Sequence, residues 1–338
     1  MNFFKLFLLF LNAFFFIFHS KIANFYNIYD KPDSVRKYHK LPTSLIGGLI
    51  LFLNFYYFII YSILFQNFYE NEIFVSNKTL FNLFFLNSSF FLIGYLDDKF
   101  NISANKKFIT IFLIILTAVL IDKNLIINEL RFSSFYKVIY LENFSIIFTT
   151  LCILLFINAF NMFDGINCQA GLYAFGLLVV LFLNSQSINI FLTFIIPLLF
   201  FLYFNYKDKM FLGNSGSLFL SILLSQLIIL EYSNNKLLAD EIVLLLIFPG
   251  LDMLRLFIER LLRNKSPFDA DRAHIHHFIS NKLNNFYTVF LTVGVQFFVF
   301  FVYYFTKFKS YYFIFFLVFY YLSLYFFFSK NDAKKPIN

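Results

Sequence analysis

Apolar segments separated by short polar ones run along the chain from one end to the other. Eleven of them have polar or charged borders: 3–18, 45–65, 79–96, 108–121, 144–160, 169–184, 188–204, 217–231, 240–258, 285–305 and 311–328. A helix needs about 20 apolar residues, within a range of roughly 17–25, to cross the core of a bilayer. The pattern therefore predicts an all-α integral membrane protein with ten or eleven transmembrane helices.

The amino-acid composition favours the same class. Of the 338 residues, 60% are hydrophobic and 14% are charged, and 58 are Phe. A soluble domain of this length could not bury so much apolar surface. We find no internal repeat or linker, so we expect one polytopic domain over residues 1–338, with a polar tail at 329–338. Residues 1–18 lack a small-residue cleavage site, and we expect a retained span there.

The basic residues are distributed unevenly between the two predicted sides of the membrane. The formal net charge is +8, and most of the 27 Lys and Arg residues fall in alternate loops and in the tail. By the positive-inside rule these loops face the cytoplasm. The charge therefore indicates topology, and we expect no nucleic acid as a partner. On the opposite side, residues 122–143 contain alternating stretches and are expected to form a small hairpin.

Five polar loops on the predicted cytoplasmic side hold most residues that could carry chemistry. They are residues 30–40, 97–99, 158–167, 213–217 and 269–277. A polytopic transporter, the alternative class, would place such groups within its spans. Few ionisable residues lie there, so the loops favour a catalytic surface that faces the cytoplasm.

Two carboxylates, Asp97 and Asp98, are adjacent at the end of a span. Their charges repel, and Mg²⁺, which prefers oxygen ligands, would relieve that repulsion. A solvated helix end is the alternative. Lys107 follows closely, with Lys99 and Lys106, and is suited either to pairing with the carboxylates or to binding phosphate.

Four polar residues follow one another at intervals of three: Asn158, Asn161, Asp164 and Asn167. On a helix this spacing places side chains on one face. Polar groups repeated at a membrane boundary need partners, either ions and polar ligands or, as an alternative, the amides of a neighbouring helix. Further on, Gly-Asn-Ser-Gly-Ser at 213–217 opens a span, where a helix N-terminus favours anions.

Three of the five histidines, His274, His276 and His277, lie within four residues. Without a second pair of Cys or His they make a poor zinc motif. Hydrogen bonding to a phosphorylated substrate is the better interpretation, with Arg255 as a further cation. A basic loop that serves only topology is the alternative.

Taken in order, these loops resemble those of the polyprenyl-phosphate N-acetylhexosamine-1-phosphate transferase family, glycosyltransferase family 4. The resemblance covers roughly residues 30–280. It rests on Asp30-Lys31-Pro32, Arg36, His39, Gly47-Gly48, Asp97-Asp98, Ser103-Ala104, Lys107, Asn158–Gly165, Asp252, Arg255, Ser266-Pro267-Phe268 and His274–His277. The His-Ile-His-His sequence is more similar to the WecA branch of the family than to the MraY branch.

Two positions depart from the family pattern. Asn167 stands where the family usually has the second Asp of Asp-Gly-x-Asp-Gly. Asn214 stands where Gly-Asp-x-Gly-Ser has a carboxylate that is implied to hold Mg²⁺. An amide oxygen can coordinate a cation but brings no charge, so we expect weaker metal binding or a changed ligand set. A non-catalytic membrane relative is the alternative.

The resemblance implies a reaction and a set of partners. The phosphate of undecaprenyl phosphate would attack the sugar-side phosphorus of a UDP-sugar, with GlcNAc as the expected sugar, and release UMP. This would be the initiating step of cell-envelope polysaccharide synthesis in the bacterial plasma membrane. Whether transfer is direct or proceeds in two steps, which polysaccharide is made, and whether the protein is a homodimer all stay open.

The resemblance also implies roles for individual residues. The implied cofactor is Mg²⁺, with Mn²⁺ as an alternative, and its expected ligands are Asp97, Asp98, Asn161 and Asn214. Asp98 and Asp164 receive positioning or proton-handling roles in catalysis. Substrate binding is assigned to Lys107, Asn158, Asn167, Arg255, His274, His276 and His277.

Overall fold

A computed structural model describes residues 2–26, 28–30, 42–65, 77–135, 137–185, 188–266 and 272–329. Some residues singled out in the sequence lie outside these ranges. They are Lys31, Pro32, Arg36 and His39 of the first polar loop, Pro267 and Phe268 before the histidines, the segment 269–271, and the tail from residue 330.

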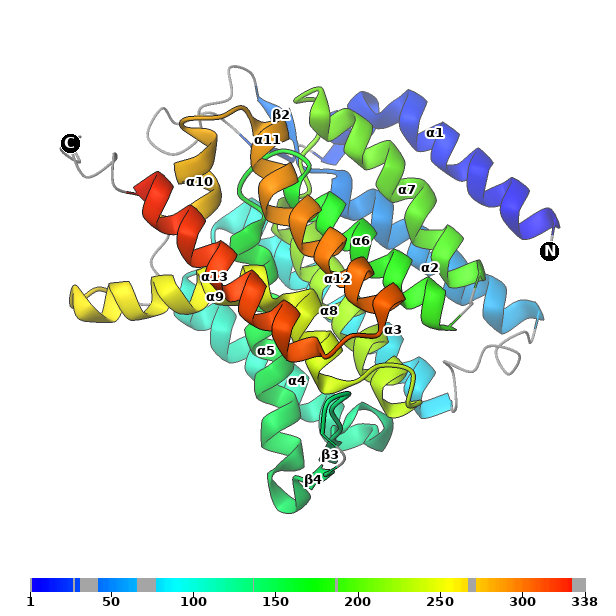
Figure 1. Ribbon diagram of the computed structural model, residues 1–338. Coiled ribbons are helices and arrows are strands. Elements are labelled where there is room, and N and C mark those ends of the chain that lie inside the picture. Colours follow the sequence, from blue (N-terminus) through cyan, green and yellow to red (C-terminus); the bar gives the residue numbers. More distant parts are fainter. Residues whose placement is uncertain are drawn as a thin grey trace. The chain divides into compact units, whose positions relative to one another are not determined.

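Every predicted apolar segment corresponds to helix. The helices are α1 (Asn2–Tyr26), α2 (Gly47–Phe65), α3 (Asn77–Phe100), α4 (Ala104–Ile121), α5 (Ser145–Phe163), α6 (Gln169–Ser185), α7 (Ile188–Tyr206), α8 (Gly213–Ser233), α9 (Ala239–Leu262), α10 (Ile275–Ser280), α11 (Asn285–Val289), α12 (Val295–Thr306) and α13 (Ser310–Ser329) (Figure 1). A π-helical turn, Phe290–Gly294, joins α11 to α12, so that they form one apolar span. The all-α prediction is confirmed.

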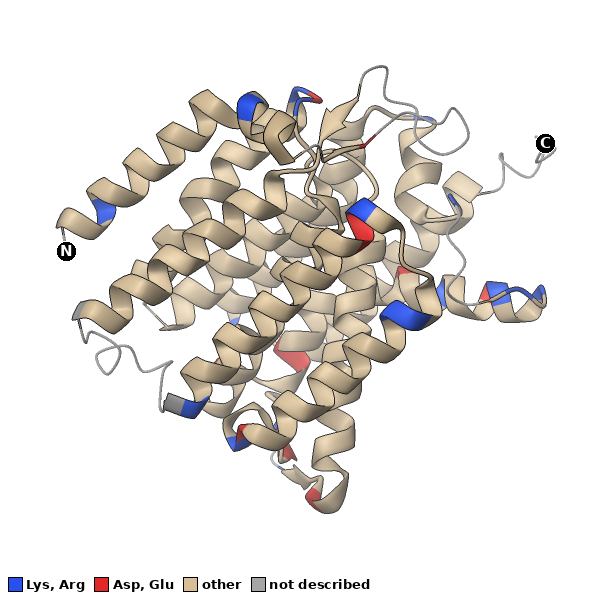
Figure 2. Ribbon diagram, turned by 180° about the vertical axis from the view of Figure 1, so that it is seen from behind, with Lys and Arg blue, Asp and Glu red and all other residues tan. Residues whose placement is uncertain are grey.

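Within the described ranges, nine helices are long and apolar enough to cross a bilayer. Of the two other predicted spans, α6 is apolar but has only 17 residues. α9 has 24 residues and carries acidic residues in its first turn and Arg260 in its last. Figure 2 shows the charged residues mainly at helix ends and in connecting segments. The protein is therefore a multi-pass membrane protein.

The chain divides into two compact units that are interleaved along the sequence. Unit 1 comprises Met1–Ile126 and Gly171–Lys236, and unit 2 comprises Ile127–Ala170 and Leu237–Asn338.

The centre of unit 1 is α8, which packs against α3 and α2. Every residue from Ser215 to Tyr232 is buried, which explains why apolar and small residues surround the helix on all sides. Amides link its neighbours: Asn87 on α3 donates to Gln226 on α8 at 2.6 Å, and Asn12 on α1 exchanges hydrogen bonds with Asn54 on α2 at 2.7 and 3.1 Å. Such interhelical bonds favour specific helix pairs in a membrane, where apolar burial discriminates little.

Two short strands also belong to unit 1. β1 (Tyr29–Asp30) pairs antiparallel with β2 (Thr43–Ser44), which places β2 directly before α2. The backbone amides of Gly47 and Gly48 then donate to the carbonyls of Phe211 and Leu212, just before α8. The starts of α2 and α8 are therefore held side by side.

The centre of unit 2 is α9, which packs against α13, α5 and α12. The hairpin predicted within residues 122–143 is confirmed, because β3 (Glu129–Leu130) pairs antiparallel with β4 (Ile139–Tyr140). The Ser133 N–H donates to Asp240 at 2.9 Å, and the Ser133 hydroxyl bonds to Asp240 and to Ser310. These bonds tie the hairpin to the starts of α9 and α13.

Candidate active site

In unit 1, the Asp98 carboxylate lies at the N-terminus of α8. Asp98 is in the last turn of α3, and its two oxygens accept the backbone N–H groups of Asn214 at 2.8 Å and Ser215 at 3.0 Å. The first N–H groups of a helix have no partner within the helix and form its positive end. A carboxylate there is stabilised by both effects. The fold thus brings Asp98 and Asn214 together across more than 100 residues of sequence.

Glycines allow this close approach. Gly94, one turn before Asp98 on α3, lies directly against the backbone of Asn214 and Ser215, and Gly48 on α2 lies against Gly216. A Cβ at either glycine would overlap with that backbone. Gly213 has a φ of +71°, in the left-handed region that favours glycine. The Gly/Ser segment predicted at the start of a span is therefore packed between α2 and α3.

Asp97 and Lys107 pair with each other. One Asp97 oxygen accepts the Ile102 N–H at 2.8 Å, and the other accepts the Lys107 ammonium at 2.8 Å. Asp97 is buried, with 6% of its surface exposed. Of the two roles that the sequence left open for Lys107, the structure contains the ion pair, which closes the turn between α3 and α4.

The donor groups of unit 1 fit a hard divalent cation. Asp97 and Asp98 offer carboxylate oxygens, each with lone pairs beyond those used above, and Asn214 offers an amide oxygen. Oxygen donors of this kind suit Mg²⁺ and Mn²⁺. The fourth predicted ligand, Asn161, lies on α5 in unit 2.

In unit 2, the motif that begins at Asn158 lies at the end of α5. The helix ends at Phe163, and Asp164 caps it. The prediction that all four polar residues share one helical face is therefore wrong: Asn158 and Asn161 are on the helix, whereas Asp164 and Asn167 follow it. The physical reason is the turn into α6, which includes Gly165 and a left-handed Cys168 with φ of +66°. The Asn158 amide donates back to Leu154 at 2.7 Å.

Asp252, on α9, is the centre of a buried hydrogen-bond network. One oxygen accepts from Arg255 at 2.8 Å, from the Tyr321 hydroxyl at 3.0 Å and from the Ile275 N–H at 3.2 Å. The other accepts from His274 Nδ1 at 3.0 Å. These donors compensate for the burial of the carboxylate, which is 2% exposed.

The guanidinium of Arg255 donates hydrogen bonds to groups of the protein itself. Besides Asp252, it donates to the Glu259 carboxylate at 2.8 Å, to the Ala273 carbonyl at 2.7 Å and to the Tyr321 hydroxyl at 2.9 Å. Four of its five N–H groups are thus engaged, and Tyr325 lies 4.7 Å from the guanidinium and donates to Glu259. Arg255 joins α9 to α13 and to the residues just before α10, which is a different use from the substrate binding that the sequence analysis assigned.

Tyr321, Tyr325 and Glu259 were missed in the sequence. The two tyrosines sit in α13, where aromatic residues occur on all sides and no periodicity separates the inner face from the outer one. Only their spacing of four residues, which places both on one helical face, could have indicated a shared partner.

The histidines form a compact group before and within α10. The ring of His276 lies 5.2 Å from that of His274 and 4.3 Å from that of His277, measured between centroids. His276 is fully buried, and both of its ring nitrogens lack a hydrogen-bond partner among the described residues. Burial, together with the charges of His277 and His274, lowers the pKa of the His276 imidazole well below its usual value. It is therefore neutral at pH 7.

His276 also meets the motif at the end of α5. A Cβ on Gly165 would overlap with His276 Nε2, so the Asp164-Gly165 turn lies directly against this ring. Gln169, at the start of α6, is equally buried, and its amide finds no partner within the described ranges. Two polar side chains without partners are thus available close to the turn that carries Asp164. Gln169 is a further residue that the sequence analysis missed.

Asp252, His274 and His276 offer ligand atoms within 4.8 Å of one another, as a metal site would. The Asp252 oxygens, however, already accept four donors, one of them the Arg255 cation. A metal ion would have to displace these donors beside a permanent positive charge. The group therefore fits a hydrogen-bonded ion-pair network and not a metal centre.

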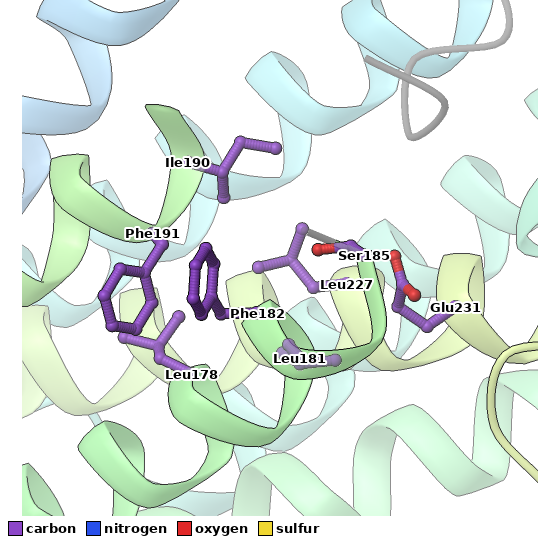
Figure 3. A pocket seen from close by; sticks show the side chains of 8 residues that line it. All are labelled: Leu178, Leu181, Phe182, Ser185, Ile190, Phe191, Leu227 and Glu231. Atoms are coloured by element: carbon purple, nitrogen blue, oxygen red, sulfur yellow. The ribbon is translucent and has the colours of Figure 1, made fainter. Parts of the chain in front are cut away.

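A small cavity of about 10 Å³ lies between α6, α7 and α8 in unit 1 (Figure 3). Its lining is apolar apart from Ser185 and Glu231. It holds at most one water molecule. Glu231 is also roughly 25 Å from Asn214 along α8, so this cavity is not part of the candidate active site.

Fold and site together define a multi-pass membrane protein with carboxylates, amides and histidines at its helix ends. Residues 80–231 match the sequence profile of the family described as "Glycosyl transferase family 4". Three relatives align with most of the length of the chain. An undecaprenyl-phosphate alpha-N-acetylglucosaminyl 1-phosphate transferase of Thermotoga maritima is 29% identical over 271 residues, 78% of this chain and 77% of the relative.

The second relative, a probable undecaprenyl-phosphate N-acetylglucosaminyl 1-phosphate transferase of Bacillus subtilis, is 30% identical, over 73% of this chain and 68% of the relative. The third, from Escherichia coli K12, has the same description as the Thermotoga protein and is 27% identical, over 78% and 72%. The chain belongs to glycosyl transferase family 4, as its motifs predicted, and it is an enzyme of the phosphotransferase class.

Proposed function

We propose that this protein transfers N-acetylglucosamine 1-phosphate from UDP-N-acetylglucosamine to undecaprenyl phosphate and releases UMP. The lipid acceptor and the sugar are those that the descriptions of its relatives state. The observation that carries the proposal is the placement of Asp98, which shares the N-terminus of α8 with Asn214. Two of the motifs on which the family resemblance rests are thereby adjacent.

The reaction needs positioning and charge neutralisation more than strong general-base catalysis. The phosphate of the lipid has a second pKa near 6 and is largely dianionic at pH 7, so it is already a nucleophile. In phosphoryl transfer, alignment of the attacking and leaving oxygens and stabilisation of charge lower the barrier. The side chains described above are suited to these tasks.

Asp97, Asp98 and Asn214 would hold Mg²⁺, and coordination by Asn161 stays a prediction from the sequence. When bound, Mg²⁺ supplies positive charge against the diphosphate of the nucleotide. The chain's own contribution is orientation: two α8 amides fix the Asp98 carboxylate, and Lys107 with the Ile102 N–H fixes Asp97. Asp164 is proposed to position the acceptor or handle its proton.

The histidine group is proposed to bind the nucleotide sugar. Asp252 fixes the orientation of His274 through Nδ1, which leaves Nε2 for a ligand. His276, neutral and without a partner in the described part of the chain, can donate one hydrogen bond and accept another. Arg255 is proposed to position this group. Substrate binding by Lys107, Asn158, Asn167 and His277, and a cytoplasmic position of the site, remain predictions.

Substitution of Asp98 tests the proposal. In detergent, with UDP-N-acetylglucosamine, undecaprenyl phosphate and Mg²⁺, Asp98→Asn is expected to lower UMP release at least about a hundredfold, because removing an electrostatic group from a catalytic centre costs about 10²–10³ in rate. Asp208→Asn, an exposed carboxylate of unit 1, is the matched control and should retain normal turnover. Near-normal turnover of Asp98→Asn would remove this residue from the catalytic machinery.

A further inference from the structure

Pro249 leaves a gap in the hydrogen bonding of α9. It lies in the interior of the helix, and proline has no backbone N–H to donate to the carbonyl four residues earlier. That carbonyl belongs to Leu245. A buried carbonyl without a donor is costly, by about 1–3 kcal/mol in typical cases, so a partner is needed.

A side chain from another helix supplies the missing donor. The amide of Gln296, on α12, donates to the Leu245 carbonyl and lies 3.3 Å from the Leu244 carbonyl. Gln296 is fully buried. Its NH₂ group must point at the two carbonyls, because the opposite orientation would bring oxygen against oxygen.

The π-helical turn before α12 contributes to this contact. Phe290–Gly294 ends two residues before Gln296. A π turn adds one residue to a helical turn and so rotates the side chains that follow by about 100°. The irregular turn therefore affects which α12 side chain faces the Leu245 carbonyl.

The residue directly after Pro249 borders open space. Gly250 follows directly, and a Cβ there would meet nothing within 4 Å. A Pro-Gly pair within a helix is a common place for bending. Two residues further on, α9 carries Asp252, which bonds to His274 and to the Ile275 N–H at the start of α10. Arg255, on the same helix, donates to Asp252, to Glu259 and to the Ala273 carbonyl.

We propose that Gln296 is a positioning residue for the active site: its amide replaces the donor that Pro249 removes, and so fixes the half of α9 that carries Asp252, Arg255 and Glu259. The effect on turnover rests on the proposed function. The effect on the backbone of α9 does not, and the two can be measured separately.

A double-mutant cycle tests this role. Gln296→Leu removes the donor, whereas Pro249→Ala restores the backbone N–H and makes the Gln296 donor unnecessary. In the wild-type background, Gln296→Leu is expected to lower kcat/KM roughly tenfold, as loss of one hydrogen bond to a buried group would. In the Pro249→Ala background, the same substitution should change kcat/KM by less than about twofold.

Hydrogen exchange, followed by mass spectrometry in detergent, gives the second readout. Gln296→Leu should accelerate amide exchange in residues 250–262 in the wild-type background, but not in the Pro249→Ala background. Gln226→Leu is the control, because this buried glutamine of unit 1 accepts a hydrogen bond from the Asn87 side chain on α3. Its effects should be the same in both backgrounds.

The outcomes separate the two proposals. Equal effects of Gln296→Leu in both backgrounds, on exchange and on turnover, would overturn the positioning role and leave Gln296 as packing. If the Gln296→Leu protein cannot be purified but the Pro249→Ala, Gln296→Leu double variant can, the positioning role is supported. A wild-type protein without transferase activity would refute the proposed function, and exchange in residues 250–262 would still decide the role of Gln296.

Discussion

At the residue scale, three carboxylates of the candidate site are matched by hydrogen-bond donors. Asp97 has Lys107 and a backbone amide, Asp98 has two amides of α8, and Asp252 has Arg255 and His274 among its four donors. An ionised carboxylate buried without such donors would cost several kcal/mol. These residues are therefore held in defined orientations before any substrate arrives.

Asn214→Asp tests one of the two residues that depart from the family pattern. A carboxylate here would add negative charge beside Asp98, so the Mg²⁺ concentration for half-maximal UMP release should fall by about tenfold, which is ~1.4 kcal/mol of binding. Asn234→Asp, at the other end of α8, adds the same charge to the same helix and should leave the Mg²⁺ requirement unchanged. If the Asn214→Asp variant needs the same Mg²⁺ concentration as the wild type, residue 214 is not a Mg²⁺ ligand.

At the element scale, the position of α8 is set by close backbone contact. α8 is buried along nearly its whole length, and its first turn lies against Gly48 and Gly94. The first residues of this helix carry Asn214 and hold Asp98. Small displacements of the helix would therefore change the geometry of both motifs.

Gly94→Ala tests this contact. Its methyl group would overlap with the Asn214 carbonyl and the Ser215 backbone, neither of which can rotate away. Overpacking of this kind typically costs about 1–3 kcal/mol, so we expect a lower thermal midpoint and at least about tenfold lower turnover. Ser88→Ala, on the same helix, is the control, because this buried hydroxyl has no partner within the described chain. Wild-type turnover and stability for Gly94→Ala would contradict the close contact.

The helices themselves were predictable from hydropathy, but several of their ends were not. The span 3–18 continues to Tyr26 in α1, and 240–258 continues to Leu262 in α9. Polar residues were interpreted as borders in both cases, although a helix continues through them wherever its backbone stays hydrogen-bonded. The span 144–160 likewise continues to Phe163 in α5, within the motif that begins at Asn158.

At the scale of the whole molecule, the polar motifs of the candidate site were visible in the sequence, whereas the side chains that they bond to were not. Asp98, Asp252 and His274 stand out because charged and polar residues are rare in this chain. Tyr321, Gln169 and Gln296 do not stand out, because a buried Tyr or Gln is recognisable only by the group it faces. Long-range contacts such as Gln296 with Leu245 depend on helix rotation, which periodicity cannot give in a sequence this rich in Phe.

The most direct test of the whole account is the identity of both products. The purified protein would be incubated with undecaprenyl phosphate, Mg²⁺ and an equimolar mixture of UDP-sugars, and lipid and nucleotide products would be identified by mass spectrometry. We predict undecaprenyl pyrophosphoryl N-acetylglucosamine and an equal amount of UMP, with no product when the divalent cation is chelated. Release of UDP in place of UMP, or no modified lipid with any sugar, would contradict the account.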